Sequence, residues 1–396
     1  MKTPRYIIDE AALKRNLEIL KSVSDRAGVK VLLAQKAFSC AAVYPLCAKY
    51  LAGTTASSLF EAKHGHDNFG GETHVFAPAF IPEEMDELLG LVDHIVFNSP
   101  RQVARYGEKA RASGVSVGLR VNPEVSVATT PAYDPCRPNS RLGTTRSALE
   151  RQLSTTTYHL PTTNYHLPPT NYHLPPTNLL DGLHFHCLCE QGVEELRKVL
   201  VGFEEKFGDL LPQMKWVNFG GGHHVTRADY DVDGLVALLN DFRARYPHLT
   251  VYLEPGEAIA LNAGTLESRV LEIQPPGEDG ISNAILDTSA ACHMPDVLEM
   301  PYTPRVCGAE IGTAGPHVYT FGGPTCLAGD TIGTYSFPHP LNEGDKVVFE
   351  DMAIYSMVKN NTFNGVNLPD IALRHVDGTE ETLRRFGYDD FAVRLG

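Results

Sequence analysis

The strongest constraint on the fold is a regular alternation of short β-type runs with helical stretches between residues 30 and 256. Three of the helical stretches, 99–114, 194–208 and 232–247, repeat apolar residues every three to four positions. Because strictly alternating strands and helices require parallel strands, the pattern predicts a (β/α)8 barrel or a doubly wound open sheet. The eight β-type runs are VLLAQK (31–36), TTASS (54–58), HVFAP (74–78), HIVFN (94–98), VGLRVN (117–122), GLHFH (182–186), WVNFGG (216–221) and VYLEPG (251–256).

Polar residues at the ends of these runs favour the barrel over the open sheet. They stand at the carboxyl ends of different strands, and in a closed barrel those ends converge on one mouth. These residues are Lys36, Ser58, Asn98, Asn122, His186, Gly220 to Gly222 and Glu254. The sequence therefore predicts a TIM barrel with a lysine, a histidine, a glycine loop and a glutamate at its mouth.

A second region begins after Gly264, where β-type runs are separated by turn residues without long helical periodicity. We expect a mainly antiparallel β domain there, and we expect the strand-like RYIID (5–9) to pair with it. The predicted barrel spans 10–262, with an insertion at about 150–178, and the β domain combines 1–9 with 263–396. The runs of this domain are 266–274, 283–289, 317–323, 331–337, 346–352 and 370–376.

Charge and segment composition exclude several classes of protein. The formal net charge of -14 argues against nucleic-acid binding, which needs a basic surface, and it suits a cationic small molecule. The amino-terminal MKTPRYIIDE lacks the apolar run of a signal peptide, and no stretch approaches the ~18 to 20 apolar residues of a membrane span. Eight cysteines without a CxxC pair do not form a disulfide scaffold. We expect a cytoplasmic protein without membrane contact.

Two strand ends carry residues suited to an aldehyde and to a phosphate. Lys36 ends an apolar strand, where a partly desolvated lysine can lose its proton and form a Schiff base, although a single lysine more often extends into solvent. Glycines 220–222 and the segment EPGE (254–257) follow the seventh and eighth strands, where barrels often bind phosphate. Three glycines can equally form a tight turn.

Glu254 and His186 extend this pattern to a pyridine ring. A carboxylate keeps the ring nitrogen protonated, and a flat imidazole stacks on the face of the ring. Each residue alone also has a structural explanation, as a helix-capping carboxylate or a core histidine. Their combination with Lys36 and the glycine loop on four strands of one barrel favours the functional interpretation.

At these residues the chain resembles the fold-type III pyridoxal-phosphate decarboxylases, the ornithine and diaminopimelate decarboxylase group with an alanine-racemase-like barrel. The resemblance is carried by LLAQKAF around Lys36, HFHCLCE around His186, the glycines 220–222, EPGE (254–257) and GGPTCLAGD (322–330). Within the family the chain is similar to the carboxynorspermidine (carboxyspermidine) decarboxylases. Supporting stretches are TTASSLFEAKHG (54–65), SRLG (140–143), HMPD (293–296) and VKNNTFNGV (358–366).

The resemblance implies a role for each matching residue. Lys36 would bind pyridoxal 5'-phosphate covalently, His186 would stack on its ring, and Glu254 would bind its pyridinium nitrogen. Gly221, Gly222 and the backbone of 255–257, including Gly256, would hold the phosphate together with Tyr355. The family also implies a homodimer with shared active sites, completed by Cys326 of the partner subunit as proton donor and by Asp330 of the partner subunit.

The substrate class is indicated by Glu257, which stands where ornithine and diaminopimelate decarboxylases have arginine. A carboxylate there favours a substrate with a cationic far end. By the resemblance, Glu257 and Asp296 would bind the amino groups of a carboxylated polyamine, and Leu327 after Cys326 also fits a longer substrate. The implied reaction converts carboxynorspermidine or carboxyspermidine to norspermidine or spermidine in polyamine biosynthesis, and the residues do not choose between the two.

Three other functions remain open from the residues. An amino-acid racemase of the same family would use a tyrosine in place of Cys326, and a non-catalytic carrier of the cofactor would lack the β domain. A metal-binding protein would depend on the repeat TTTYHLPTTNYHLPPTNYHLPPTN (155–178), with His159, His166 and His173 at seven-residue steps. Its prolines exclude a helical heptad and predict an extended or disordered insertion. In HFHCLCE the histidines and cysteines alternate faces, so we expect no shared metal site there.

Overall fold

The computed structural model describes residues 2–154 and 179–396, and the repeat 155–178 lies outside the described residues. The chain divides into two compact units. The barrel unit comprises Leu17–Lys36 and Val43–Ala258, and the β unit comprises Met1–Asn16, Ala37–Ala42 and Ile259–Gly396. Compared with the predicted boundaries, this division groups residues 10–16, 37–42 and 259–262 with the β unit.

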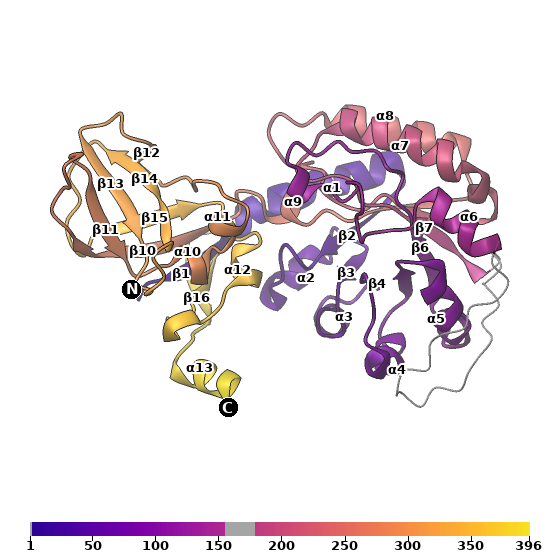
Figure 1. Cartoon of the computed structure of the whole chain (residues 1–396), viewed down its shortest axis with the longest axis horizontal. Coiled ribbons are helices and arrows are strands. Elements are labelled where there is room, and N and C mark those ends of the chain that lie inside the picture. The colour runs from indigo at the N-terminus through magenta and orange to yellow at the C-terminus, as the bar shows by residue number, and fades with distance from the viewer. Residues whose placement is uncertain (1, 155–178) are drawn as a thin grey trace. The chain divides into compact units, whose positions relative to one another are not determined.

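The barrel unit contains a closed barrel of eight parallel strands, which confirms the predicted fold class and excludes the open sheet (Figure 1). Neighbouring strands pair in chain order, and the barrel closes where Lys30 and Val31 lie opposite Tyr252 and Leu253. Most strand residues are buried, as the apolar runs predicted. The strands are β2 (Lys30–Ala34), β3 (Gly53–Ala56), β4 (Glu72–Phe76), β5 (His94–Phe97), β6 (Ser116–Arg120), β7 (Gly182–His184), β8 (Trp216–Asn218) and β9 (Thr250–Leu253).

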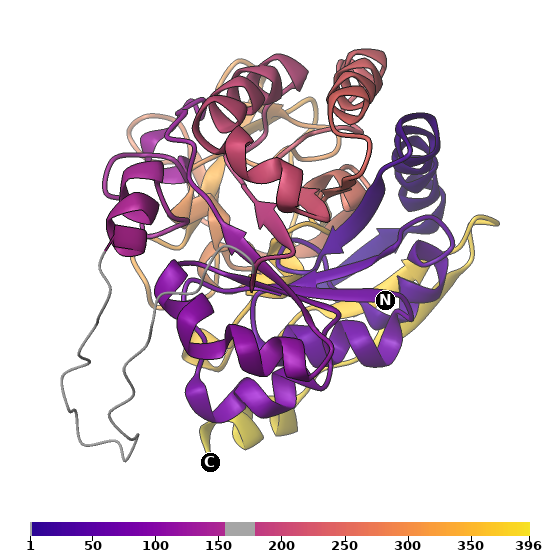
Figure 2. The same cartoon turned by 90° about the vertical axis from the view of Figure 1, so that its right-hand side faces the viewer.

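Helices surround these strands (Figure 2). Three of them begin at a side chain that accepts a backbone N–H of the first turn: Ser58 from Glu61, Ser99 from Gln102 and Asp231 from Gly234. The helices are α1 (Glu10–Ala27), α2 (Tyr44–Cys47), α3 (Leu59–Asn68), α4 (Met85–Leu89), α5 (Pro100–Ala112), α6 (Arg146–Ser154), α7 (Val193–Phe207), α8 (Val232–Arg245) and α9 (Glu257–Ala260). The helical stretches predicted at 99–114, 194–208 and 232–247 are confirmed.

Trp216, the first residue of β8, packs closely against its neighbours in the barrel core. Trp216 packs with Leu32, Val96 and Tyr252 in a buried cluster. A Cβ atom added at Gly182 would lie 2.1 Å from the indole of Trp216, so the ring occupies space that only a glycine leaves free. The barrel is therefore a packed core, and its polar side chains gather at the two ends of the strands.

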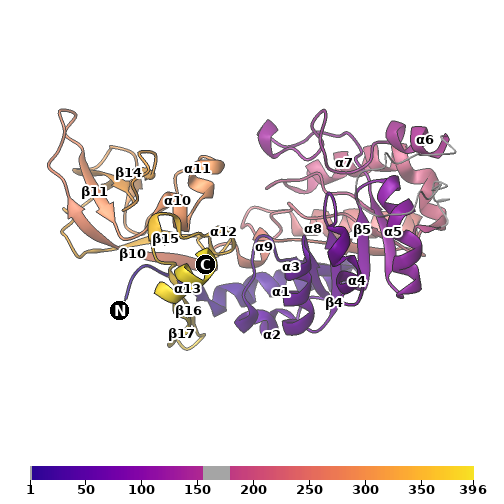
Figure 3. The same ribbon diagram turned by 60° about the horizontal axis from the view of Figure 1, so that its bottom comes forward.

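The β unit is a mainly antiparallel sheet with strand order β12-β14-β13-β11-β10-β1-β16-β17, in which β15 also pairs with β10. The predicted role of RYIID is confirmed, because β1 pairs with β10 antiparallel and with β16 parallel. Figure 3 shows β16, β17 and α13 together at one end of the sheet. The strands are β1 (Arg5–Asp9), β10 (Gly264–Ile273), β11 (Ser282–Leu286), β12 (Glu310–Ile311), β13 (His317–Gly322), β14 (Thr331–Phe337), β15 (Lys346–Glu350), β16 (Asp370–Arg374) and β17 (Glu380–Arg384).

Short helices complete this unit: α10 (Ala290–His293), α11 (Asp296–Glu299), α12 (Ser356–Lys359) and α13 (Tyr388–Leu395). The sequence did not predict β12 and β17. The residues of β17 are mostly exposed and polar, so they lack the alternation that marks a half-buried strand. None of the helices in the described ranges has both the length and the apolar character needed to span a bilayer.

Candidate active site

Lys36 stands two residues beyond β2, at the carboxyl end of the barrel. The residue before it is anchored on three sides. The Gln35 N–H donates to the Thr55 carbonyl (3.1 Å), and its side-chain amide donates to the Glu61 carbonyl (2.8 Å). The Tyr44 hydroxyl donates to the Gln35 amide oxygen (3.0 Å). With Gln35 fixed in the core, the Lys36 side chain is directed out of the packed strand and is exposed.

The surroundings of Lys36 favour its neutral amine. Its side chain is open to solvent, yet the protein around the mouth desolvates the ammonium and lowers the pKa of Lys36. The nearby Arg120 guanidinium lowers this pKa further, while the Glu254 and Glu257 carboxylates oppose the shift. An accessible lysine with a lowered pKa is a nucleophile toward an aldehyde.

His186, two residues beyond β7, is held as a neutral ring. Its Nδ1 accepts the N–H of Gly221 (2.9 Å), so the proton of the neutral imidazole is on Nε2. Burial and the charges of Lys36 and Arg120 lower the pKa of His186 well below its ordinary value. A flat, uncharged ring therefore stands near the lysine.

Glu254, directly after β9, is a buried carboxylate with two partners. Its Oε2 lies 3.1 Å from Nε2 of His184, and its Oε1 accepts the side-chain amide of Asn218 (2.7 Å). Burial raises its pKa, but the neighbouring His184, His74 and Asn218 outweigh this and lower the pKa of Glu254 to about 2. A carboxylate has about four acceptor positions, so this ionised group can still bind a cationic ring nitrogen.

The glycine loop after β8 is closely packed against its neighbours. A Cβ atom at Gly221 would lie 2.1 Å from the Glu254 carbonyl oxygen, and one at Gly222 would lie 2.1 Å from the Leu188 carbonyl oxygen. Gly222 also has a φ of +84°, a conformation that favours glycine. The Gly221 N–H is already used by His186, whereas the Gly222 N–H has no acceptor in the part of the chain that the structure describes. Gly222 is thus the better donor for a phosphate.

Arg120, the last residue of β6, is a site residue that the sequence analysis missed. Its Nη2 donates to the His186 carbonyl (3.1 Å), and its guanidinium lies 4.5 Å from the centroid of the Phe76 ring. Burial is the main cause that lowers the pKa of Arg120 to about 10, so it remains cationic at neutral pH. A single arginine within the apolar run VGLRVN was the signal that could have revealed it.

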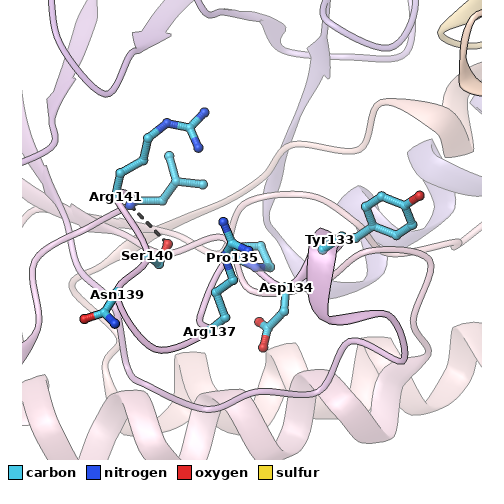
Figure 4. Close-up of a pocket in the computed structure, with 9 residues that line it drawn as sticks. Tyr133, Asp134, Pro135, Arg137, Asn139, Ser140 and Arg141 are labelled. Carbon is cyan, nitrogen blue, oxygen red and sulfur yellow. Dashed lines mark hydrogen bonds between the residues drawn. The ribbon is translucent and has the colours of Figure 1, made fainter. Parts of the chain in front are cut away.

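The SRLG motif lies in the loop between β6 and α6. Asn98 holds this loop, because its side-chain amide donates to the Arg141 carbonyl (2.8 Å) and its oxygen accepts the Gly143 N–H (2.6 Å). The loop lines a cavity of about 280 Å³, and Arg137 and Arg141 are among its lining residues (Figure 4). All the lining residues come from 132–142, so we do not assign this cavity to the site around Lys36.

An acidic group lies beside the same mouth. Glu257 begins α9, and its Oε2 lies 3.0 Å from Nε2 of the buried His224. Glu190, after β7, offers a carboxylate oxygen within 4.8 Å of the ligand atoms of both residues. Burial and the Glu257 charge raise the pKa of Glu190, as expected for two carboxylates that share a small region. Such a pair attracts a cation. Sequence analysis singled out Glu257 and missed Glu190 and His224.

In the β unit, Cys326 is exposed in the loop 322–330, and its backbone N–H donates to the Asn364 side chain (2.8 Å). Asp330, at the end of the loop, is buried. It accepts the Ser289 hydroxyl (2.9 and 2.8 Å to its two oxygens) and the Thr325 hydroxyl (2.7 Å). Asp330 therefore holds the ends of the loop that presents Cys326.

Asp296 and Tyr355 also lie in the β unit. Asp296 forms an ion pair with Lys359, whose ammonium also pairs with Glu299. Tyr355 has a φ of 49°, a left-handed conformation that is uncommon for a large side chain and concentrates at functional sites. Its N–H donates to the carbonyl of Ala37, the residue that follows Lys36 (2.7 Å). This hydrogen bond lies within the β unit and fixes the backbone at Tyr355.

The predicted site residues fall into two sets. The barrel unit brings together Lys36, His186, Gly221, Gly222, Glu254, Gly256 and Glu257, and the β unit contains Asp296, Cys326, Asp330 and Tyr355. Their individual roles stay predictions. His184 forms a hydrogen bond with Glu254, and it belongs to neither of the two groups with metal-ligand geometry among the described residues.

A barrel with this mouth, joined to a mainly antiparallel sheet unit, defines a class of protein. The chain belongs to the pyridoxal-dependent decarboxylases, because the family model described as "Pyridoxal-dependent decarboxylase, C-terminal sheet domain" matches residues 6–353. Pyridoxal phosphate is the cofactor of this family. The barrel residues fit it: Lys36 is accessible with a lowered pKa, Glu254 is ionised, and His186 is neutral.

Three known proteins place the chain more closely within this family. It is 40% identical over its full length to a carboxyaminopropylagmatine decarboxylase from Synechocystis sp., covering 96% of that protein. It is equally 40% identical to a carboxynorspermidine/carboxyspermidine decarboxylase from Campylobacter jejuni, covering 98% of that protein. A crystal structure of carboxynorspermidine decarboxylase from Campylobacter jejuni, complexed with norspermidine, is similar with a TM-score of 0.85, 39% identity and full coverage of both chains.

Proposed function

We propose that this chain decarboxylates carboxynorspermidine, carboxyspermidine or both in polyamine biosynthesis, with pyridoxal phosphate as cofactor. The observation that carries the proposal is the acidic group of Glu257, Glu190 and His224 at the mouth that contains Lys36. A substrate with a cationic far end suits two carboxylates there, whereas a substrate ending in a second carboxylate would be repelled. The 40% identity with the Campylobacter jejuni enzyme supports the same substrate class.

Residues of the barrel would hold the cofactor and set its charge. When bound, pyridoxal phosphate supplies an acceptor for the electron pair that the leaving carboxylate releases. Lys36 would hold the aldehyde, and its lowered pKa favours the neutral amine that such a bond requires. Glu254, with a pKa of about 2, is ionised and would hold a proton at the ring nitrogen. His186 would support the ring face without adding charge.

A cationic group near Lys36 would orient the substrate carboxylate. Arg120 remains protonated at neutral pH and acts electrostatically on Lys36. Arg120 and the carboxylates of Glu190 and Glu257 would give the mouth opposite charges for the two ends of the substrate. The substrate would bind with its carboxylate toward Arg120 and its distal amines toward the glutamates.

The β unit would complete the site in a cytoplasmic homodimer. Cys326 of the partner subunit would protonate the carbon that has lost its carboxylate, and the exposed position of Cys326 in its loop supports this role. Asp330 is saturated by donors of its own unit, which supports a role in holding that loop. A substrate amine would reach Asp296 in competition with Lys359, which is already paired with it.

The test compares product formation from carboxynorspermidine, carboxyspermidine, diaminopimelate and ornithine, with and without added pyridoxal phosphate. We expect norspermidine or spermidine as product and at least a tenfold lower kcat/KM for diaminopimelate and ornithine. In the variant Glu257→Gln, the KM for the carboxylated polyamine should rise about tenfold, since one charged hydrogen-bonding partner of the amine is lost. The matched control is Glu194→Gln, an exposed glutamate of α7. Preference for diaminopimelate would contradict the proposal.

Carboxyaminopropylagmatine is the second candidate substrate, favoured by the 40% identity with the Synechocystis enzyme. This substrate ends in a guanidinium, a planar fork that two carboxylates such as Glu190 and Glu257 can bind in bidentate fashion. Adding it to the same assay separates the candidates. A higher kcat/KM for it than for either carboxylated triamine would assign the chain to agmatine-derived substrates.

A further inference from the structure

The opposite end of the barrel holds a second polar group, far along the strands from Lys36. Glu72 and His94 are the first residues of β4 and β5, and the strands pair in register with His74 opposite His94. Their side chains lie on one face, and the two imidazole rings stack 4.0 Å apart with an angle of 11°. A nitrogen of each ring and a carboxylate oxygen of Glu72 lie within 4.8 Å of one another.

The imidazoles of this group have unused nitrogens. His74 is 1% exposed, and its Nδ1 is buried without a hydrogen-bond partner among the described residues. The Nδ1 of His94 is likewise buried and unpartnered within residues 2–154 and 179–396. No hydrogen bond in that part of the chain involves the second nitrogen of His94 either. Buried polar groups without partners are uncommon in native proteins and call for a ligand.

We propose that Glu72, His74 and His94 bind one divalent transition-metal cation of the Zn²⁺ class. Two imidazoles and one carboxylate are a known Zn²⁺ ligand set, with a fourth position left for water. Tetrahedral ligands at Zn²⁺ bond lengths stand about 3.3 Å from one another. The Glu72 Oε2 and His74 Nε2 are already 3.1 Å apart. The two rings are stacked with an angle of 11°, so one imidazole must rotate before both can direct a lone pair at the same ion.

The hydrogen bonds of Glu72 suit a metal ion. A metal ion takes its ligands as a deprotonated carboxylate and neutral imidazoles. Lys30 pairs with the other oxygen of Glu72 and orients the carboxylate as an outer-shell partner does.

The Lys30 charge also determines which ions fit. It balances the negative charge of Glu72, so an ion at this site must be held largely by the two imidazole nitrogens. Ca²⁺ and Mg²⁺ prefer oxygen ligands and gain little there, whereas Zn²⁺ and Co²⁺ bind imidazole well. We expect micromolar affinity for Zn²⁺ and no binding of Mg²⁺. The other group with ligand geometry, Glu190, His224 and Glu257, already has an assignment as the amine site.

The experiment uses the full chain with its cofactor, in a background where His159, His166 and His173 are replaced by glutamine to remove the repeat as a competing ligand. Zn²⁺ is titrated by calorimetry, and Co²⁺ is followed by difference absorption. We expect one ion per chain, with visible Co²⁺ bands and no thiolate charge-transfer band. His94→Asn and Glu72→Gln should weaken binding about 10- to 100-fold. His224→Asn, from the other group, should leave the affinity at this site unchanged.

These measurements test metal binding directly and do not depend on the decarboxylase activity of the protein. If the background protein binds no Co²⁺, or gives a thiolate band, the proposal is overturned even if a further variant fails to fold. Unchanged Zn²⁺ affinity in a folded His94→Asn variant overturns it as well. A rise in the melting temperature with Zn²⁺ but not with Mg²⁺, lost in Glu72→Gln, supports it.

Discussion

The two ends of the barrel contain the same pair of side chains in different surroundings. At the carboxyl end, Glu254 Oε2 lies 3.1 Å from His184 Nε2, and at the amino end Glu72 Oε2 lies 3.1 Å from His74 Nε2. The pKa of each glutamate is lowered to about 2, although burial opposes the shift in both. At each end a neighbouring histidine therefore contributes to keeping the carboxylate ionised.

The second oxygen of each glutamate makes the difference. Glu254 bonds there to the neutral amide of Asn218, whereas Glu72 pairs with the ammonium of Lys30. The charge of Glu254 remains available for a cationic ring nitrogen, while that of Glu72 is balanced within the protein. The comparison teaches that the third residue bonded to each glutamate, Asn218 or Lys30, decides whether the carboxylate keeps an unbalanced charge that a cationic ligand could use.

The largest expected effect is a loss of kcat on replacing Lys36, compared with little change on replacing Lys30. Lys30 begins this strand and Lys36 follows its end, so they mark the two ends of the barrel. Lys36→Ala should lower kcat on the order of 10³-fold and abolish the visible absorbance of the bound cofactor, because the covalent link is lost. Lys30→Ala should leave kcat within about twofold, since the side-chain hydrogen bonds of Lys30 within residues 2–154 and 179–396 go to Glu72 and Tyr252, at the far end of the barrel. A Lys36→Ala protein that still decarboxylates at the wild-type rate would contradict the assignment of Lys36 as the residue that binds the cofactor covalently.

A smaller effect distinguishes the two glutamates. Glu254→Gln should lower kcat about 10²-fold, because a neutral amide cannot hold the proton on the ring nitrogen. Glu72→Gln should leave kcat of the holoenzyme unchanged, as its charge is balanced by Lys30 at the far end. Steady-state kinetics and the absorption spectrum of the bound cofactor check both variants. Equal losses in the two variants would show that the ends are not functionally distinct.

The fold was largely readable from the sequence. All eight barrel runs became strands, because each apolar run of a parallel sheet is buried on both faces. Several predicted strands extended beyond the observed strand ends, because the following loop residues are not in an extended conformation. The run WVNFGG, for example, ends as a strand at Asn218, and Gly220 beyond it has a φ of 70°. The polar, exposed β17 carried no periodic signal at all.

The site was only partly readable, since several of its contacts depend on strand register. Lys36, His186 and Glu254 were predicted because each follows the end of a strand within two residues. His184 and Asn218, in contrast, meet Glu254 because β7 and β8 pair with these two residues side by side. The same holds at the amino end, where register alone stacks His74 on His94. A single sequence does not specify register between strands distant along the chain.

Two glycines offer a comparison of packing at the two ends. Gly182→Ala would place a Cβ 2.1 Å from the Trp216 ring, and we expect it to destabilise the fold by about 2 kcal/mol. Folded Gly182→Ala protein should keep its activity per bound cofactor. Gly221→Ala would place a Cβ 2.1 Å from the Glu254 carbonyl and should weaken cofactor retention instead. Denaturant titration and cofactor release by dialysis measure the two effects, and a reversed pattern would contradict the division.

The smallest expected effect concerns acid stability at the amino end. Because burial lowers the pKa of His94 to about 3, the unfolded chain binds a proton near pH 6.5 that the folded chain does not. The contribution of neutral His94 is therefore present above pH ~6.5 and is lost as the pH falls toward ~3. The carboxylate of Glu72, with a pKa of about 2, begins to lose its contribution only below ~4.5, the ordinary range of a glutamate.

Between pH ~7.5 and ~5.5, a change in the free energy of unfolding therefore depends on the imidazole of His94 and not on the carboxylate of Glu72. As the pH falls from ~7.5 to ~5.5, the free energy of unfolding should decrease by about 1 kcal/mol less in His94→Gln than in wild type, because the variant lacks the His94 imidazole. The other buried histidines are present in both proteins and cancel in the comparison. Urea titrations at three pH values, with a chelator present to exclude metal, measure the difference. Parallel curves for the two proteins would mean that His94 is protonated in the folded barrel, and the charge balance assigned to this end would then be wrong.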